Sequence, residues 1–119
     1  MSDLVGQKLF NAAYDGRASE VSSPFRDHPD IDVNWAVSED QWTPLHAASL
    51  KGYVEVAKLL LAHPNINVNL KDSIGQTPLL FCCQWGHVSL VRLLLWGTVA
   101  LLLLNIMLSS AELTIGSKY

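Results

Sequence analysis

Thr43-Pro44-Leu45-His46-Ala47-Ala48 is the stretch that decides the fold, and it returns in altered form 34 residues later as Thr77-Pro78-Leu79-Leu80-Phe81-Cys82. The same step of 34 residues joins Gly52 to Gly86. It also joins the leucine triplet at 59–61 to the triplet at 93–95. Three separate landmarks that recur in one register indicate an internal repeat.

Each landmark has a role in a pair of helices. The side-chain oxygen of Thr43 can accept a hydrogen bond from the free N–H groups of a first helical turn, and Pro44 suits the first helical position. Gly52 supplies the left-handed backbone conformation that ends a helix. A second helix then carries Leu59 and Leu60 on its apolar side. The pattern predicts two short antiparallel helices per unit, with apolar faces that neither helix buries alone.

This pattern resembles the ankyrin repeat, whose signature T-P-L-H-x-A recurs about every 33 residues. Residues 43–48 match the signature at every fixed position, whereas the second copy has Leu80 in place of the histidine and Cys82-Cys83 in place of small alanines. The resemblance implies a hydrogen bond between Thr43 and His46. It also implies an all-α fold, an ankyrin-repeat solenoid of stacked helix-turn-helix units with short hairpin loops.

The first unit lacks the signature but keeps the helix pattern. Residues 2–16 predict a helix that ends at Gly16. The second helix of this unit is predicted to be short, because Pro24 has no N–H to donate inside it.

Connectors separate the units. His-Pro-Asp-Ile-Asp-Val-Asn at 28–34 recurs as His-Pro-Asn-Ile-Asn-Val-Asn at 63–69, and a hairpin-like tip follows each copy. Gly75 fits the expected turn position of its tip, and Gln41 does not. We therefore expect one repeat domain over residues 1–98, with units at about 1–34, 35–69 and 70–98.

An apolar segment, residues 99–119, follows the repeats as a cap or tail. No charge occurs between Arg92 and Glu112, so residues 93–111 could form a membrane span. If Gly97 ends the last repeat helix, however, only ten residues, 99–108, remain, about 15 Å of helix. We therefore favour a tail that packs on the third unit. A membrane anchor, self-association through the tail, and a truncated fragment of a longer repeat protein remain as alternatives.

Composition limits the functions to consider. The net charge is −3 and the eight basic residues are scattered, which argues against nucleic-acid binding. The N-terminus lacks the features of a secretory signal, so we expect an intracellular, cytoplasmic protein. The two cysteines are sequence neighbours and are expected to be reduced packing residues. No motif supports a catalytic, cofactor or metal site, and we expect no enzyme activity.

The resemblance implies binding of a protein partner, whose identity the sequence does not give, through the tips and the first helices of the repeats. Transferred by position, the candidate protein-binding residues are Tyr14, Asp15, Glu39, Asp40, Trp42, Leu50, Lys51, Ser73, Ile74, Gln76, Gln84 and Trp85. Tyr14, Trp42 and Trp85 would form an aromatic line, and such residues dominate binding energy at interfaces. Alternatively, Trp42 or Trp85 covers the neighbouring repeat.

Overall fold

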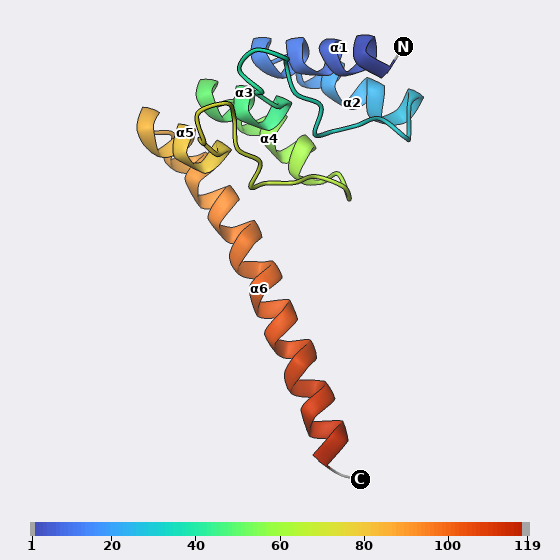
Figure 1. Ribbon diagram of the computed structural model, residues 1–119, viewed down its shortest axis with the longest axis vertical. Helices are drawn as coiled ribbons and strands as arrows, with labels where there is room; N and C mark the ends of the chain where they lie inside the picture. Colours follow the sequence, from blue (N-terminus) through green and yellow to red (C-terminus); the bar gives the residue numbers. More distant parts are fainter. Residues whose placement is uncertain (1, 118–119) are drawn as a thin grey trace.

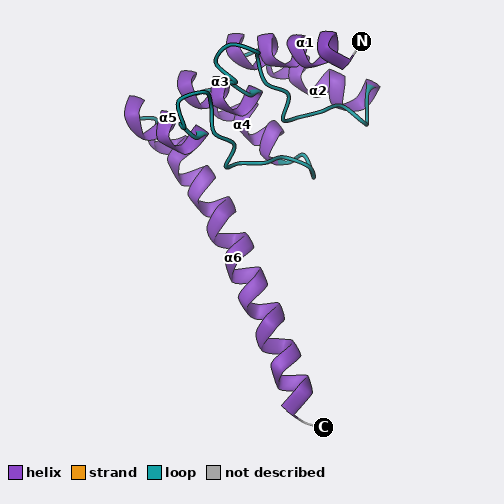
Figure 2. Cartoon of the chain, viewed as in Figure 1, coloured by secondary structure: helices purple, strands orange, loops and turns teal. Residues whose placement is uncertain are grey.

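A computed structural model describes residues 2–117. Within this range the chain forms helices joined by loops, with no strand (Figures 1 and 2). The helices are α1 (Ser2–Asp15), α2 (Ala18–Asp27), α3 (Pro44–Lys51), α4 (Val54–Leu61), α5 (Pro78–Trp85) and α6 (Val88–Ser117).

The helices form three pairs that stack side by side. The first, or inner, helix of each pair packs against the inner helix of the next pair, α1 on α3 and α3 on α5. The second helices do the same, α2 on α4 and α4 on α6. Within each pair, α1 contacts α2, α3 contacts α4, and α5 contacts α6. This arrangement confirms the predicted all-helical repeat fold, whereas the boundaries between the units stay predictions.

Local capping explains where α3 begins and ends. Thr43 Oγ1 accepts a hydrogen bond from the His46 N–H at 3.3 Å, and the Thr43 N–H donates one to His46 Nδ1 at 3.1 Å. Gly52 ends the helix with φ at +75°. The predicted contact between Thr43 and His46 is therefore confirmed. In α5, Thr77 caps in the same way, but Leu80 cannot return a hydrogen bond to the Thr77 N–H.

The core follows the seam between the stacked pairs. Leu9, Leu45, Leu60 and Leu90 are fully buried, one or more in each pair. Alanines at 12, 13, 47 and 48 are buried between the inner helices, where their small side chains allow the helices to approach closely. Cys82 takes the corresponding place on α5 and is buried as a free thiol.

The prediction that Pro24 shortens the second helix is wrong. Helix α2 runs for 10 residues with Pro24 inside it. The proline removes one helical hydrogen bond, while Val21 is fully buried and α2 packs against both α1 and α4. Tertiary packing therefore outweighs the loss of that one bond.

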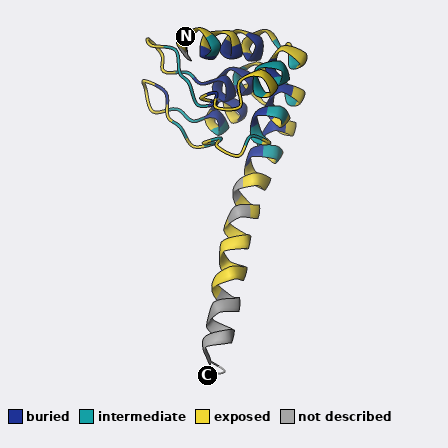
Figure 3. Cartoon of the chain, turned by 90° about the vertical axis from the view of Figure 1, so that its right-hand side faces the viewer, coloured by how far each residue is buried: buried dark blue, intermediate teal, exposed yellow. Residues whose placement is uncertain are grey.

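The prediction that Gly97 ends the last repeat helix is also wrong. Helix α6 continues through Gly97 for 30 residues in all. The leucines on both sides of Gly97 favour helix and offset the cost of one glycine inside it. From Leu95 onward the described side chains are exposed and α6 projects away from the stack (Figure 3). The described part of the tail therefore does not pack on the third unit as a cap.

Candidate functional site

A hollow of about 610 Å³ lies between α1 and the loop that leads into α3. We call it the α1–loop groove. Its lining residues are Asp3, Gln7, Phe10, Tyr14, Trp35, Ala36, Val37, Ser38, Glu39, Asp40 and Trp42. Four of the sequence-predicted binding residues, Tyr14, Glu39, Asp40 and Trp42, are brought together here.

One wall of the groove is a face of α1. Asp3, Gln7, Phe10 and Tyr14 follow one another at steps of four, three and four, which places them on the same side of a helix. The rings of Phe10 and Tyr14 stack at 6.1 Å between centroids. The Trp35 ring forms the floor of the groove and meets the Phe10 ring edge-on, with 6.5 Å between centroids. The floor and this wall therefore form one aromatic cluster.

Trp35 reaches this position because Gly6 lies beneath it. A side chain at Gly6 would collide with the Trp35 ring, and Gly6 is itself buried. The glycine therefore permits the close approach of the loop to α1.

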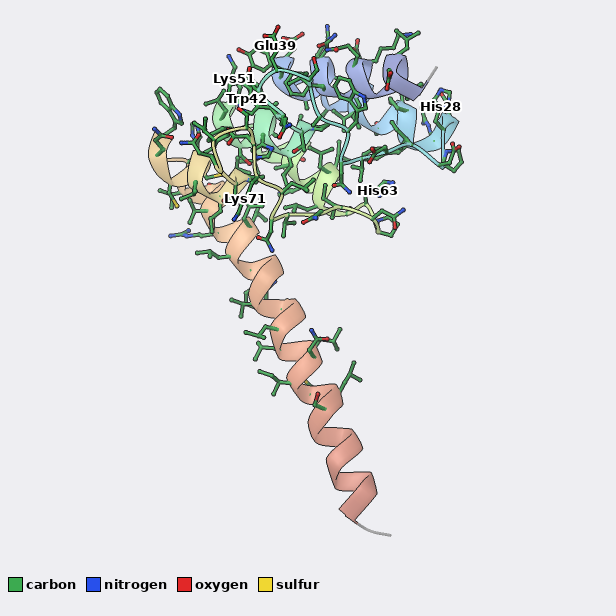
Figure 4. All side chains as sticks on the ribbon, viewed as in Figure 1. His28, Glu39, Trp42, Lys51, His63 and Lys71 are labelled. Atoms are coloured by element: carbon green, nitrogen blue, oxygen red, sulfur yellow. The ribbon has the colours of Figure 1, made fainter. Side chains whose placement is uncertain are left out.

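The opposite wall is a closed turn. The Val37 N–H donates a hydrogen bond to the Trp42 carbonyl at 2.9 Å, and the Gln41 N–H donates one to the Val37 carbonyl at 2.8 Å. Gln41 has φ at +58°, so it adopts the left-handed conformation that Gly75 adopts in the next tip at +85°. The expectation that Gln41 does not fit the turn position is wrong. The turn leaves Glu39, labelled in Figure 4, and Asp40 exposed at the rim.

Trp42 joins the groove to the third unit. Its Nε1–H donates a hydrogen bond to Asp72 Oδ2 at 3.0 Å, and its ring meets the Phe81 ring edge-on, with 5.6 Å between centroids. Trp42 is half-buried and also lines the groove. It therefore covers the neighbouring repeat, as the alternative expected, while one part of its surface stays open to a partner.

Asp72 organises the second tip beneath Trp42. Its Oδ1 accepts the N–H groups of Ile74 at 3.1 Å and Gln76 at 2.7 Å. Burial by itself would raise the pKa of Asp72, but the hydrogen bonds from Gln76, Trp42 and Ile74 outweigh it and lower the pKa. Asp72 is therefore a charged acceptor that fixes the tip.

His46 links the same two units from inside. Its Nδ1 accepts from Thr43, so in the neutral ring Nε2 carries the proton and donates to the Gln76 carbonyl at 2.9 Å. Burial lowers the pKa of His46, against the opposing effects of the Gln76 carbonyl and the Asp72 charge. The neutral imidazole is thus the form that the fold requires.

A cation contacts Tyr14, one of the groove residues. Lys51 Nζ lies 4.5 Å from the centre of the Tyr14 ring, a cation–π contact that holds Tyr14 in place. Asp15 is paired with Arg17 at 3.3 Å. In the view of Figure 4, Glu39, Trp42 and Lys51 lie on the same side of the stack, with His28 and His63 away from them on the connectors.

The remaining candidates lie outside the groove. Ile74 and Trp85 are 77% and 62% exposed, and Ser73 and Gln84 are exposed as well. The carbonyls of Leu50 and Gln76 accept hydrogen bonds from His87 and His46, so these two residues also have structural roles. Trp85 does not line the hollow that holds Tyr14 and Trp42.

Sequence reasoning missed the other seven lining residues, Asp3, Gln7, Phe10, Trp35, Ala36, Val37 and Ser38. The helical spacing of the first three was the available signal. For Trp35, the approach over Gly6 has no marker in the repeat motif. Among the described residues, no group of three or more His, Cys, Asp or Glu side chains could hold a metal ion. The groove offers aromatic surface and carboxylates, which suits binding.

Comparison with known proteins places this arrangement among repeat proteins. A family model described as ankyrin repeats, in three copies, matches residues 9–101. A probable E3 ubiquitin-protein ligase of Oryza sativa subsp. japonica, XBOS32, is 32% identical over 90 residues, 76% of this chain and 18% of that protein. The 26S proteasome non-ATPase regulatory subunit 10 of Dictyostelium discoideum is 42% identical over 57 residues, 48% of this chain and 25% of that subunit. The protein phosphatase 1 regulatory subunit 12A of Mus musculus is 46% identical over 52 residues, 44% of this chain and 5% of that subunit. The chain thus spans a quarter or less of the length of each of these relatives.

Proposed function

Because this chain belongs to the ankyrin-repeat family, we propose that it is a protein-binding module that acts as an adaptor or scaffold through the α1–loop groove. Ankyrin repeats generally mediate protein–protein interaction. The observation that carries the proposal is the preformed groove, in which aromatic rings form the floor and carboxylates form the rim. The regulatory-subunit names of two relatives fit such a role.

The chemistry of the groove defines the partner segment. Aromatic surface from Phe10, Tyr14 and Trp35 would contact an apolar side chain, and Asp3, Glu39 and Asp40 would attract a lysine or arginine at the rim. We therefore infer a peptide segment that combines apolar and basic residues. Rim charges mainly change the association rate, so binding should weaken as salt is added.

The groove should need little reorganisation on binding. Gly6, the closed turn and the contact of Lys51 with Tyr14 already hold the walls in place. A rigid site avoids part of the entropy cost of ordering side chains at an interface. The free thiols of Cys82 and Cys83 support placing the module in a reducing intracellular compartment.

A selection of displayed random peptides on the full chain, held in mild detergent, tests the proposal. We expect enriched peptides to pair basic with apolar residues, and we expect the double variant Glu39→Lys, Asp40→Lys to lose them by tenfold or more. The matched control is Asp27→Lys, Asp30→Lys, which makes the same charge change on the connector side. Equal retention of the peptides by both double variants would overturn the assignment of this groove.

A further inference from the structure

Helix α6 leaves the repeat stack after its first two turns. Leu90 and Leu94 are buried in the third unit, and Leu93 is half-buried. Farther along the same helix, the exposed large apolar side chains are Leu95, Trp96, Val99, Leu102, Leu103, Leu104, Ile106, Met107 and Leu108. Figure 3 shows this change from buried to exposed along one continuous helix.

The part of α6 beyond Leu94 is long enough to cross a bilayer without unfolding the third unit. Residues 95–111 carry no charge, and 17 residues of helix span about 26 Å at a rise of 1.5 Å per residue. A hydrocarbon core is about 30 Å thick, and spans begin at about 17 residues. Local thinning of the bilayer accommodates a difference of a few Å. Because α6 continues through Gly97, a span does not compete with the packing of Leu90 and Leu94.

The distribution of apolar side chains around α6 favours lipid over a protein partner. Leu102, Leu103 and Leu104 are consecutive, so they point about 100° apart, and each is at least 50% exposed. A second copy of the helix would cover one stripe only, and a helix that lies in the membrane surface needs a polar face. A bilayer covers all sides at once. The sequence places a single polar residue, Asn105, between positions 99 and 108.

The junction with the repeats has the composition of a headgroup contact. Trp96 is 71% exposed, and Arg92 and Lys58 are exposed beside it, with Lys58 Nζ 3.5 Å from Glu55 Oε1 in an exposed ion pair. Together with Val54, Ser89, Leu93, Leu95 and Val99 they line a hollow of about 740 Å³ between α4 and α6. Tryptophan prefers the membrane interface, and cations near the surface attract anionic lipids.

We propose that residues 95–111 of α6 span a lipid bilayer, with Trp96, Arg92 and Lys58 at the headgroups of anionic phospholipids on the repeat side. This inference is independent of the groove, because none of its residues lines the α1–loop groove.

The test uses cell-free synthesis of the full chain in the presence of vesicles of phosphatidylcholine with phosphatidylserine. We expect the wild-type chain to float with the vesicles after a carbonate wash. The variant Leu103→Arg, Leu104→Arg places two charges at the centre of the span and should be released. The control Ser73→Arg, Gln84→Arg adds the same charge at exposed positions of the repeats and should still float. Flotation of both variants, or of neither, would overturn the span.

Cysteine labelling separates a span from a surface-bound helix. In a Cys82→Ala, Cys83→Ser background, Leu104→Cys should resist a membrane-impermeant maleimide until the vesicles are dissolved in denaturant, whereas Gln84→Cys should react at once. Labelling of both cysteines in intact vesicles would overturn the proposal. The variant Lys58→Glu, Arg92→Glu should stay carbonate-resistant but lose preference for phosphatidylserine over pure phosphatidylcholine, by roughly fivefold per cation.

Discussion

Although it lies in a loop, Asp72 should contribute more to the free energy of unfolding of the stack than any exposed acidic residue. Its two oxygens accept the N–H groups of Ile74 and Gln76 and the indole N–H of Trp42. Asp72→Ala removes both acceptor oxygens, and with them all three hydrogen bonds, and separates Trp42 from the second tip. Because Gln76 also presents the carbonyl that His46 binds, the damage should spread to the contact between the second and third units.

The size of the effect follows from these bonds. Hydrogen bonds to a charged group contribute about 1.5–3 kcal/mol each, but Ile74 is exposed and water can replace its partner. Counting the bonds from Gln76 and Trp42, with partial access of water to both, we expect a loss of about 2–4 kcal/mol in the free energy of unfolding. In a domain of this size each kcal/mol lowers the melting temperature by about 4–8 °C.

Urea unfolding of the full chain in mild detergent, followed by circular dichroism, measures this loss. Asp40→Ala is the matched control, since it removes an exposed carboxylate from the neighbouring tip but keeps the bond from the Ser73 N–H to its carbonyl. We expect it to change stability by less than about 0.5 kcal/mol. Asp72→Asn keeps one carbonyl acceptor and should fall between the two. If Asp72→Ala and Asp40→Ala unfold at the same urea concentration, the role assigned to the Asp72 bonds is refuted.

Two further predictions concern pH and glycine. The folded state lowers the pKa of His46 below 6.5, so acid protonates the unfolded chain first and stability should fall as pH drops below about 6.5. The urea concentration at the unfolding midpoint should depend less steeply on pH for His46→Gln than for the exposed control His28→Gln. Equal slopes for the two variants would contradict the role given to His46. Gly52 and Gly86 have nearly the same φ, +75° and +72°, but a side chain at Gly52 would lie 2.6 Å from His87 Nδ1 while one at Gly86 meets nothing within 4 Å. Gly86→Ala should therefore cost about 1–2 kcal/mol, and Gly52→Ala about 1–3 kcal/mol more; equal unfolding free energies would show that His87 does not restrict this turn.

The fold could be predicted because the features that determine it are local. Thr43 and Pro44 start a helix, Gly52 ends it, and a fixed step repeats these choices, so the helix pairs follow from nearest-neighbour chemistry. The bond between Thr43 and His46 is likewise confined to one turn of chain. Local rules of this kind carry over from one unit to the next without knowledge of the whole structure.

The features that could not be predicted depend on what lies nearby in space. Gly86 ends α5 in the left-handed conformation while Gly97 lies inside α6, although an added side chain would meet nothing within 4 Å at either glycine. The space around the glycine therefore does not decide between the two outcomes, and the leucines around Gly97 favour helix. Gln41 takes a positive φ because the hydrogen bonds of the turn require it. Trp35 lines the groove because Gly6, in another unit, leaves space for its ring.

Helix α1, which forms one wall of the groove, and the apolar part of α6 lie at opposite ends of the stack (Figure 1). The groove is formed by α1 and the loop before α3, while α6 departs from the third unit. A bilayer around residues 95–111 would therefore leave the groove in water, and a partner in the groove would not touch the lipid. Each stacked unit is stabilised by its neighbours, so a helix fixed in the bilayer would hold α5 and, through Trp42 and Asp72, the loop that forms the groove. Binding and anchoring can then act in the same molecule without sharing a residue.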